Sequence, residues 1–194
     1  MAPPEDVRAE PGMASEANVD GAPPASPPDF EWDLPDYVQA PQLPAGARMT
    51  KALVALGEAL FHEPRLSLDG KLSCASCHER ARAFTVAEAT HLGATGLRTP
   101  RNAQSLANVA FARYLTWSNL TLVTLEQQAL NPLFGDNPVE LGAGTISGSP
   151  DHYDPLRLRA TVGQDPELSQ LFAAAYPERP ASAAPSWDDA IAAL

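Results

Sequence analysis

The chain has 194 residues, of which 44% are hydrophobic, and carries a net charge of −11 at pH 7. Most of the negative charge lies in residues 1–45, where nine acidic side chains face Arg8 as the single basic one, so residues 46–194 are close to neutral. The chain has neither a basic stripe nor a run of about 18 apolar residues, which argues against a nucleic-acid partner and against a membrane span.

Residues 1–45 are predicted to form a disordered, acidic, Pro-rich tail. They hold ten of the twenty prolines, and bulky apolar residues first occur at residues 30–35. A segment of this composition cannot bury enough apolar surface to fold. A basic start followed by an apolar stretch, the mark of a signal peptide, is not visible in this sequence. The folded domain is expected to span residues 46–194.

The first predicted helix begins at Thr50. Leu53, Leu56 and Leu60 recur there at helical spacing, and Pro64 disfavours helix at the residue before it. This amphipathic helix leads into a loop that contains the Asp69-Gly70 turn.

The loop presents Cys74-Ala75-Ser76-Cys77-His78, which holds both cysteines of the chain. A CxxCH sequence is the attachment signal for haem c. On one helical turn, Cys74 and Cys77 share a face and can bond the two haem vinyl groups, while His78 supplies the axial iron ligand. The sequence therefore predicts one covalently bound haem c.

Two other interpretations of these cysteines are weaker. A structural zinc site needs four ligands, and only His62, His91 and His152 remain, at no finger-like spacing. A thioredoxin-type redox pair expects a βαβ context and gives the adjacent histidine no role.

Further helices are predicted downstream of the haem sequence. They cover residues 122–130, closed by Pro132, then residues 154–162 and 166–175, and a last one that begins at Trp187. Residues 142–152 form a Gly/Ser loop, and no alternating strand pattern is present. The fold class is therefore all-α.

The sixth coordination position of the iron has no methionine downstream of His78 to fill it, and Met49 would have to reach it from the preceding helix. The position is then held by a histidine or another side chain, or is open. An open position on His-ligated iron allows peroxide to bind.

A series of short sequences in order resembles the N-terminal half of bacterial di-haem cytochrome c peroxidases and the related MauG enzymes. These are Leu56-Gly57, Arg65-Leu66-Ser67, Cys74 to His78, Ala83-Phe84-Thr85, Pro100-Arg101-Asn102, Leu106-Ala107-Asn108-Val109, Trp117, Leu125-Glu126-Gln127-Gln128-Ala129, Pro132 and Asn137-Pro138-Val139-Glu140. Residues 30–35, 115–119 and 132–135 are most similar to the MbnH-like di-haem enzymes of methanobactin clusters, in which a tryptophan of a partner protein is oxidised.

The resemblance implies a cytochrome c-like haem domain with long loops, and it implies roles for particular residues. Cys74, Cys77 and His78 would carry the peroxidatic haem. Gln128 and Glu140 match the distal Gln and Glu, Pro132 a distal proline, Trp117 the tryptophan between two haems, and Asn102 a ligand of an interdomain calcium ion. The relatives continue into a second domain with its own CxxCH, so the second haem domain is expected to be missing here.

The chain departs from the family pattern around the distal side. Ala94 stands where the peroxidases have a removable distal histidine, as in MauG-like enzymes. His91, three residues earlier, is either a replacement ligand or an exposed loop histidine. The usual Trp-Asp-Gly-Arg reads Trp117-Ser118-Asn119-Leu120, and the interval from Gln128 to Glu140 is two residues longer than usual.

The sequence thus predicts a haem c oxidoreductase that reduces hydrogen peroxide and oxidises a redox protein or a protein substrate. Peroxide cleavage needs a proton moved between the two oxygens, which a carboxylate such as Glu140 can carry. Haem c implies a periplasmic or otherwise exported protein, with a signal or lipid anchor upstream. A mono-haem electron carrier without catalysis is the alternative, followed by a non-haem interaction protein that uses the acidic tail.

Overall fold

The computed structural model describes residues 29–44, 46–117, 119–135, 137–144, 155–180 and 182–194. The helices are α1 (Lys51–Phe61), α2 (Cys74–Cys77), α3 (Leu125–Phe134), α4 (Pro155–Gly163), α5 (Pro166–Ala175) and α6 (Trp187–Ala193), with three 3₁₀ turns, η1 (Pro64–Leu66), η2 (Arg80–Arg82) and η3 (Val109–Phe111). Across these ranges β pairing is limited to two isolated bridges. The all-α prediction is confirmed, and none of the described helices is long and apolar enough to cross a membrane.

Helix α1 forms as its sequence predicts. The Thr50 hydroxyl accepts a hydrogen bond from the N–H of Leu53 at 3.1 Å and so caps the first turn. Leu53, Leu56 and Leu60 lie on one face and are buried. The helix ends at Phe61, before Pro64 begins η1.

Helices α5 and α6 also begin at side-chain caps. Asp165 accepts hydrogen bonds from the N–H groups of Glu167 and Leu168, with Pro166 in the first helical position. Ser186 accepts from the N–H of Asp189 at 3.2 Å. The predicted span of α5 and the predicted start of α6 are confirmed.

The prediction that Pro132 closes the third helix is wrong, because α3 runs from Leu125 to Phe134 with Pro132 inside it. Core packing and backbone hydrogen bonds stabilise the helix beyond the proline. Leu133 is 1% exposed and packs in the core. The returning chain also satisfies the last carbonyls, since Leu141 N–H donates to Pro132 and Ala143 N–H donates to Leu133.

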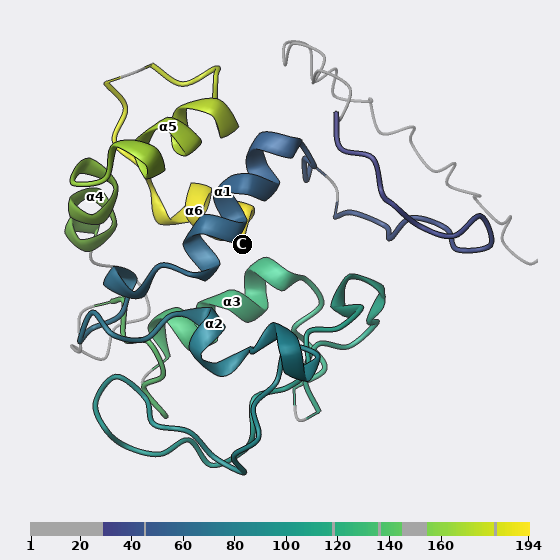
Figure 1. Ribbon diagram of the computed structural model, residues 1–194, viewed down its shortest axis with the longest axis vertical. Coiled ribbons are helices and arrows are strands. Elements are labelled where there is room, and N and C mark those ends of the chain that lie inside the picture. Colours follow the sequence, from purple (N-terminus) through teal and green to yellow (C-terminus); the bar gives the residue numbers. More distant parts are fainter. Residues whose placement is uncertain (1–28, 45, 118, 136, 145–154, 181) are drawn as a thin grey trace, which may run out of the picture.

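The core gathers around α1. Figure 1 shows α4 and α5 on one side of α1 and α6 overlapping it, with α2, α3 and the long loops of residues 79–117 on the other side. Helix α1 contacts α5 and α6, and α3 contacts α6. Helices α1 and α6 approach closely at Gly57, where an added Cβ would lie 2.0 Å from the carbonyl oxygen of Ala193. Glycine is required there by this backbone contact.

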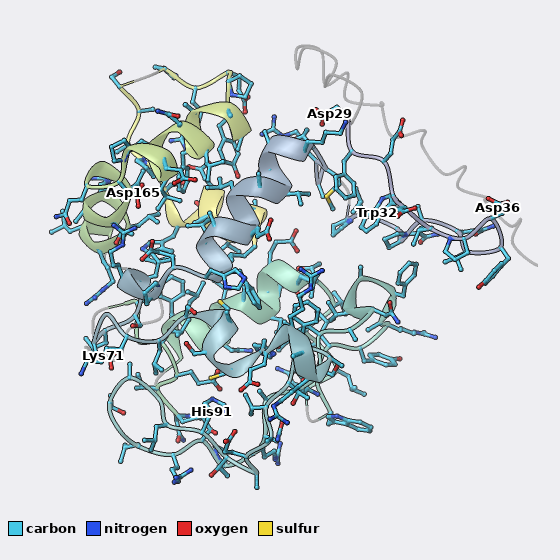
Figure 2. All side chains as sticks on the ribbon, in the orientation of Figure 1. Asp29, Trp32, Asp36, Lys71, His91 and Asp165 are labelled. Atoms are coloured by element: carbon cyan, nitrogen blue, oxygen red, sulfur yellow. The ribbon has the colours of Figure 1, made fainter. Side chains whose placement is uncertain are left out.

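The described part of the predicted tail, residues 29–44, follows an extended path without helix or strand. Asp29 accepts a hydrogen bond from the N–H of Lys51 at 2.8 Å, so the segment is joined to the first turn of α1. The rings of Phe30 and Trp32 meet edge to face. Figure 2 shows Asp29 near the start of α1 and Asp36 at the far end of the segment. Residues 1–28 lie outside the described residues.

Candidate functional site

The three residues of the haem sequence lie on one turn. Ser73 begins the turn, and its N–H donates to the Ser76 hydroxyl at 3.0 Å. Cys74 and Cys77 are the ends of α2, both with free, half-buried thiols. The N–H of His78 donates to the Cys74 carbonyl at 3.0 Å, which closes the turn. Both thiols and the imidazole are therefore available to one planar group.

The orientation of His78 is set by a backbone carbonyl. Its Nδ1 lies 2.9 Å from the carbonyl oxygen of Phe84. A carbonyl can only accept, so Nδ1 carries the proton and Nε2 is left with its lone pair for a metal. The ring of Phe61, at the end of α1, lies 6.3 Å from the imidazole between centroids.

Glu140 lies close to the haem cysteines. Burial raises the pKa of the Cys74 and Cys77 thiols to about 11, and the nearby Glu140 carboxylate adds to the increase at both. Burial also raises the pKa of Glu140 itself. A carboxyl that enters the site with a raised pKa is suited to proton transfer near neutral pH.

Two backbone contacts hold the Glu140 segment in place. The carbonyl of Glu140 accepts from the N–H of Ala94 at 2.7 Å. At the preceding position, an added Cβ on Gly93 would lie 2.0 Å from the carbonyl oxygen of Val139, so only glycine fits. The loop that contains Gly93 and Ala94 therefore packs directly against residues 139 and 140.

Gln128 and Pro132 belong to the neighbouring helix α3. The Oε1 atom of Gln128 is buried and has no hydrogen-bond partner in the part of the chain that the structure describes. Pro132 is half-buried, and its carbonyl accepts from Leu141, the residue after Glu140. Both predicted residues thus lie on the helix that holds one end of the Glu140 segment.

His91 is half-buried, so the structure differs from the exposed loop histidine that the sequence left open. Its Nδ1 lies 3.3 Å from the Thr99 hydroxyl, while Nε2 is buried without a partner. Burial, and after it the proximity of His78, lowers the pKa of His91. Figure 2 places His91 in the loop region below α2.

These observations fit a haem c group. The Nε2 of His78 is oriented and available, and two free thiols stand on the same turn. Gln128 Oε1 and His91 Nε2, two of the assigned or candidate site atoms, are buried and lack hydrogen-bond partners among the described residues. Buried polar atoms of this kind normally find a partner, so a group that reaches them is expected.

Trp117 and Asn102 lie at the surface. The Trp117 side chain is 92% exposed, and its indole N–H can donate to the Gln104 amide at 3.1 Å. Asn102 donates to the carbonyls of Val86 and Glu88, and its Oδ1 lies 2.7 Å from the Thr85 hydroxyl. In the parts of the chain that the structure describes, no three His, Cys, Asp or Glu side chains form a metal-binding group.

Ser67 is a supporting residue whose role sequence reasoning missed. It is 0% exposed, and its hydroxyl oxygen accepts from the N–H groups of Lys71 and Leu72 while lying 2.8 Å from the Pro64 carbonyl. Arg157 of α4 donates to the Ser67 carbonyl at 2.7 Å. The Arg65-Leu66-Ser67 sequence, which is part of the family resemblance, marked this loop. No local sequence pattern indicated that Arg157 would contact it.

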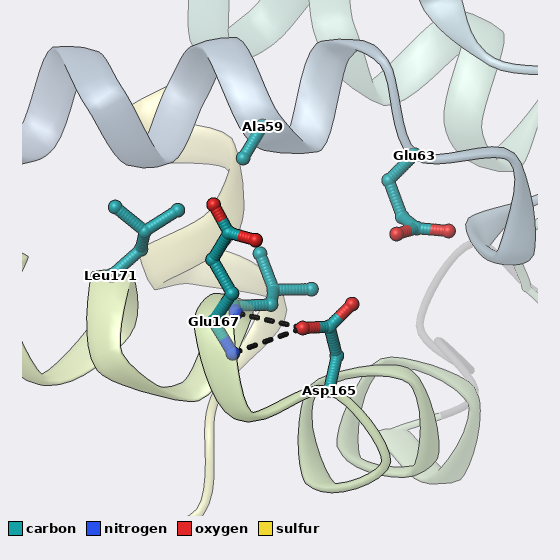
Figure 3. Close-up of a pocket in the computed structure, with 6 residues that line it drawn as sticks. Ala59, Glu63, Asp165, Glu167 and Leu171 are labelled. Carbon is teal, nitrogen blue, oxygen red and sulfur yellow. Dashed lines mark hydrogen bonds between the residues drawn. The ribbon is translucent and has the colours of Figure 1, made fainter.

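A separate hollow of about 190 Å³ lies between α1 and α5 and contains acidic side chains. Figure 3 shows Glu63 facing Asp165 across it, with Glu167 alongside. Arg65 bonds both Glu63 and Asp165, and Asp165 also caps α5. These carboxylates therefore serve the fold, apart from the haem turn.

Comparison with known proteins agrees with the geometry. The family model for di-haem cytochrome c peroxidase matches residues 51–194. The chain is 35% identical to cytochrome c peroxidase Ccp of Escherichia coli (strain K12) over 125 residues, which is 64% of this chain and 24% of that protein. It is 30% identical to the methylamine utilization protein MauG of Methylophilus methylotrophus over 146 residues, or 75% of this chain and 40% of that protein.

A solved structure shares the same fold. The crystal structure of a MauG-like protein associated with microbial copper homeostasis superposes with a TM-score of 0.72 and 41% identity, and the match covers 84% of this chain and 44% of that one. The chain thus spans less than half the length of these relatives. With its CxxCH turn, its oriented axial histidine and a family match over residues 51–194, the chain belongs to the di-haem cytochrome c peroxidase family that includes MauG.

Proposed function

We propose that the chain is the peroxide-reducing haem c domain of a di-haem oxidoreductase. Cys74 and Cys77 would hold the haem through thioether bonds, and Nε2 of His78 would bind its iron. The observation that supports this most strongly is the turn itself, which carries two free thiols and a histidine whose Nδ1 is bonded to the Phe84 carbonyl. The half-buried Glu140 carboxyl lies near both thiols.

The haem, when bound, supplies the oxidising chemistry. Glu140 moves the proton from the inner to the outer oxygen of the peroxide, a task for which its burial-raised pKa suits it. Gln128 orients the peroxide through the amide whose Oε1 has no partner within the protein. Ala94 leaves room for peroxide beside Glu140, because its side chain is only a methyl group. Its backbone N–H also donates to the carbonyl of Glu140.

The electrons come from outside this domain. Reduction of peroxide consumes electrons, which a second haem domain, a small redox protein or a protein substrate supplies. Trp117 is 92% exposed and could contact such a partner.

The similar MauG-like protein is associated with microbial copper homeostasis. We infer that this chain acts in the same setting and that its substrate is a protein. Covalent haem c implies an exported, periplasmic location. Asn102 is a candidate ligand for a calcium ion at the domain boundary.

The test is production of the chain together with a haem c maturation system, followed by mass spectrometry and mixing with peroxide. We expect one haem to be retained after denaturation and the Soret band to change on mixing. Variants in which Cys74 and Cys77 are replaced by alanine serve as the matched control for covalent attachment. A mass without haem, or a holoprotein inert to peroxide, contradicts the proposal.

A second candidate function is electron transfer by a six-coordinate haem without catalysis. It is favoured by His91, whose Nε2 is buried without a partner and which lies close enough to His78 to lower its own pKa. The visible spectrum of the ferric protein separates the two functions. A high-spin spectrum supports the peroxidase, and a low-spin one that turns high-spin in His91→Ala supports the electron carrier.

A further inference from the structure

The carbonyl that orients His78 belongs to an unusual stretch of backbone. Ala83 and Phe84 both have left-handed conformations, with φ values of 54° and 58°. Residues with a Cβ adopt this conformation at a cost, and two in succession persist only where surrounding contacts hold them. The result is that the Phe84 carbonyl points at Nδ1 of His78.

The contacts that hold this stretch come from the segment 103–106. The Ser105 hydroxyl donates to the Ala83 carbonyl at 2.5 Å. The Thr85 hydroxyl lies 2.5 Å from the Ala103 carbonyl and 2.7 Å from Oδ1 of Asn102, so these two acceptors share its one proton. The N–H of Leu106 lies 3.4 Å from the same Phe84 carbonyl that accepts from His78. The two strained residues are therefore braced on each side by a hydroxyl bond to a carbonyl.

The stretch is also tied back to the haem turn. Phe84 N–H donates to the Glu79 carbonyl at 2.9 Å, and Glu79 N–H donates to the Thr85 carbonyl at 3.1 Å. Glu79 directly follows His78. A shift of residues 83–85 away from segment 103–106 would therefore move both the Phe84 carbonyl and the backbone next to the axial ligand.

We propose that Thr85 and Ser105 are positioning residues for the axial histidine: their hydroxyls hold the Ala83–Phe84 backbone so that the Phe84 carbonyl stays bonded to Nδ1 of His78. The inference rests on the proposed haem function. A hydrogen bond from Nδ1 to a carbonyl makes the imidazole a more basic ligand, which stabilises the ferric form of a bound haem. Loosening the brace weakens this bond and raises the reduction potential.

The experiment measures the midpoint potential of the holoprotein by spectroscopic redox titration, together with haem content and melting temperature. Thr85→Val removes the hydroxyl and keeps the shape, Thr85→Ser restores the hydroxyl, and Ser105→Ala removes the second brace. Ser169→Ala is the matched control, because the Ser169 hydroxyl of α5 donates to the Val162 carbonyl of α4 at 2.7 Å and so is also a hydroxyl bond to a carbonyl. A purely structural role would lower the melting temperature without moving the potential.

We expect Thr85→Val and Ser105→Ala each to raise the potential, Thr85→Ser to return it to the wild-type value, and Ser169→Ala to leave it unchanged. The inference is overturned if the two brace variants shift the potential no more than Ser169→Ala does, or if Thr85→Ser shifts it as much as Thr85→Val. Should Thr85→Val lose its haem, Ser105→Ala decides, since it removes the bond to the Ala83 carbonyl and one from the N–H of Ala107 at an exposed residue. Wild-type protein without covalent haem overturns the proposed function as well, whereas peroxide-reactive wild type with unshifted variants overturns only this inference.

Discussion

The N–H of Ala94 donates a hydrogen bond to the carbonyl oxygen of Glu140 at 2.7 Å. This backbone bond, together with the close approach of Gly93 to Val139, fixes the segment that carries the Glu140 carboxyl. In the proposed function, Ala94 stands at the position of the family's removable histidine and Glu140 at that of its distal acid.

Glu140→Gln is expected to slow the reaction of the ferric haem with peroxide by about 10²–10⁴-fold, because the amide cannot accept the transferred proton. Stopped-flow mixing at the Soret band measures the rate. Glu126→Gln, in the first turn of α3, is the matched control and should keep the wild-type rate. Haem content should be the same in both variants. An effect below about threefold would assign the proton transfer to another group.

The ferric protein is expected to be high-spin and to react with peroxide without prior reduction, since Ala94 offers no axial ligand. His91→Ala should then leave the spin state as it is. His62→Ala, at the end of α1, is the control for loss of a histidine elsewhere. A low-spin wild type that becomes high-spin and reactive only in His91→Ala would make His91 the sixth ligand.

Gly57→Ala is expected to lower the free energy of unfolding by about 1–3 kcal/mol, the usual cost of overpacking, because its Cβ would lie 2.0 Å from the Ala193 carbonyl oxygen. Urea denaturation of the holoprotein measures the loss. Gly163→Ala, near whose Cβ no atom lies within 4 Å, should have no effect or a small stabilising one. Equal losses in the two variants would mean that α1 and α6 separate easily.

The stability of the domain is expected to depend on Asp165 at acid pH. The hydrogen bond from Arg65, and then that from the N–H of Leu168, lowers the pKa of Asp165 below 3.8. Because the folded-state pKa is the lower one, this contribution is full above the unfolded-state value and is lost as pH falls through the folded-state pKa.

Asp165→Asn should therefore be less stable than wild type at pH 6, and the difference should shrink towards pH 3. Asp36→Asn, in an exposed turn of residues 36–38, is the control for removal of a negative charge. Urea midpoints measured between these two pH values check the prediction. A constant difference between Asp165→Asn and wild type across this range would contradict it.

The helices were predictable because their signals are local. Thr50 caps the residues that follow it, Asp165 and Pro166 begin α5 together, and the leucine spacing of α1 marks the buried face. At Pro132 the local rule failed, because the burial of Leu133 and the donors from residues 141 and 143 outweigh the missing N–H of the proline.

The candidate site was predictable only in part. The CxxCH sequence specifies its attachment chemistry within five residues, and the resemblance placed Glu140 and Gln128. The left-handed backbone at Phe84 and the burial of His91 depend on contacts with residues 99–106 that no local pattern records. Arg157 reaches Ser67 across 90 positions of sequence, a pairing that only the folded chain reveals.

This long-range pairing bears on the order of assembly. Burial raises the pKa of the Cys74 and Cys77 thiols to about 11, above the usual value for a thiol, so at a given pH a smaller fraction of each is the nucleophilic thiolate than in an unfolded chain. Residues 67 and 68, just before the haem turn, are held by the carbonyl of Leu141 and by Arg157, which follow the cysteines in the chain. Thioether formation is therefore expected to be faster on an unfolded chain than on the folded domain.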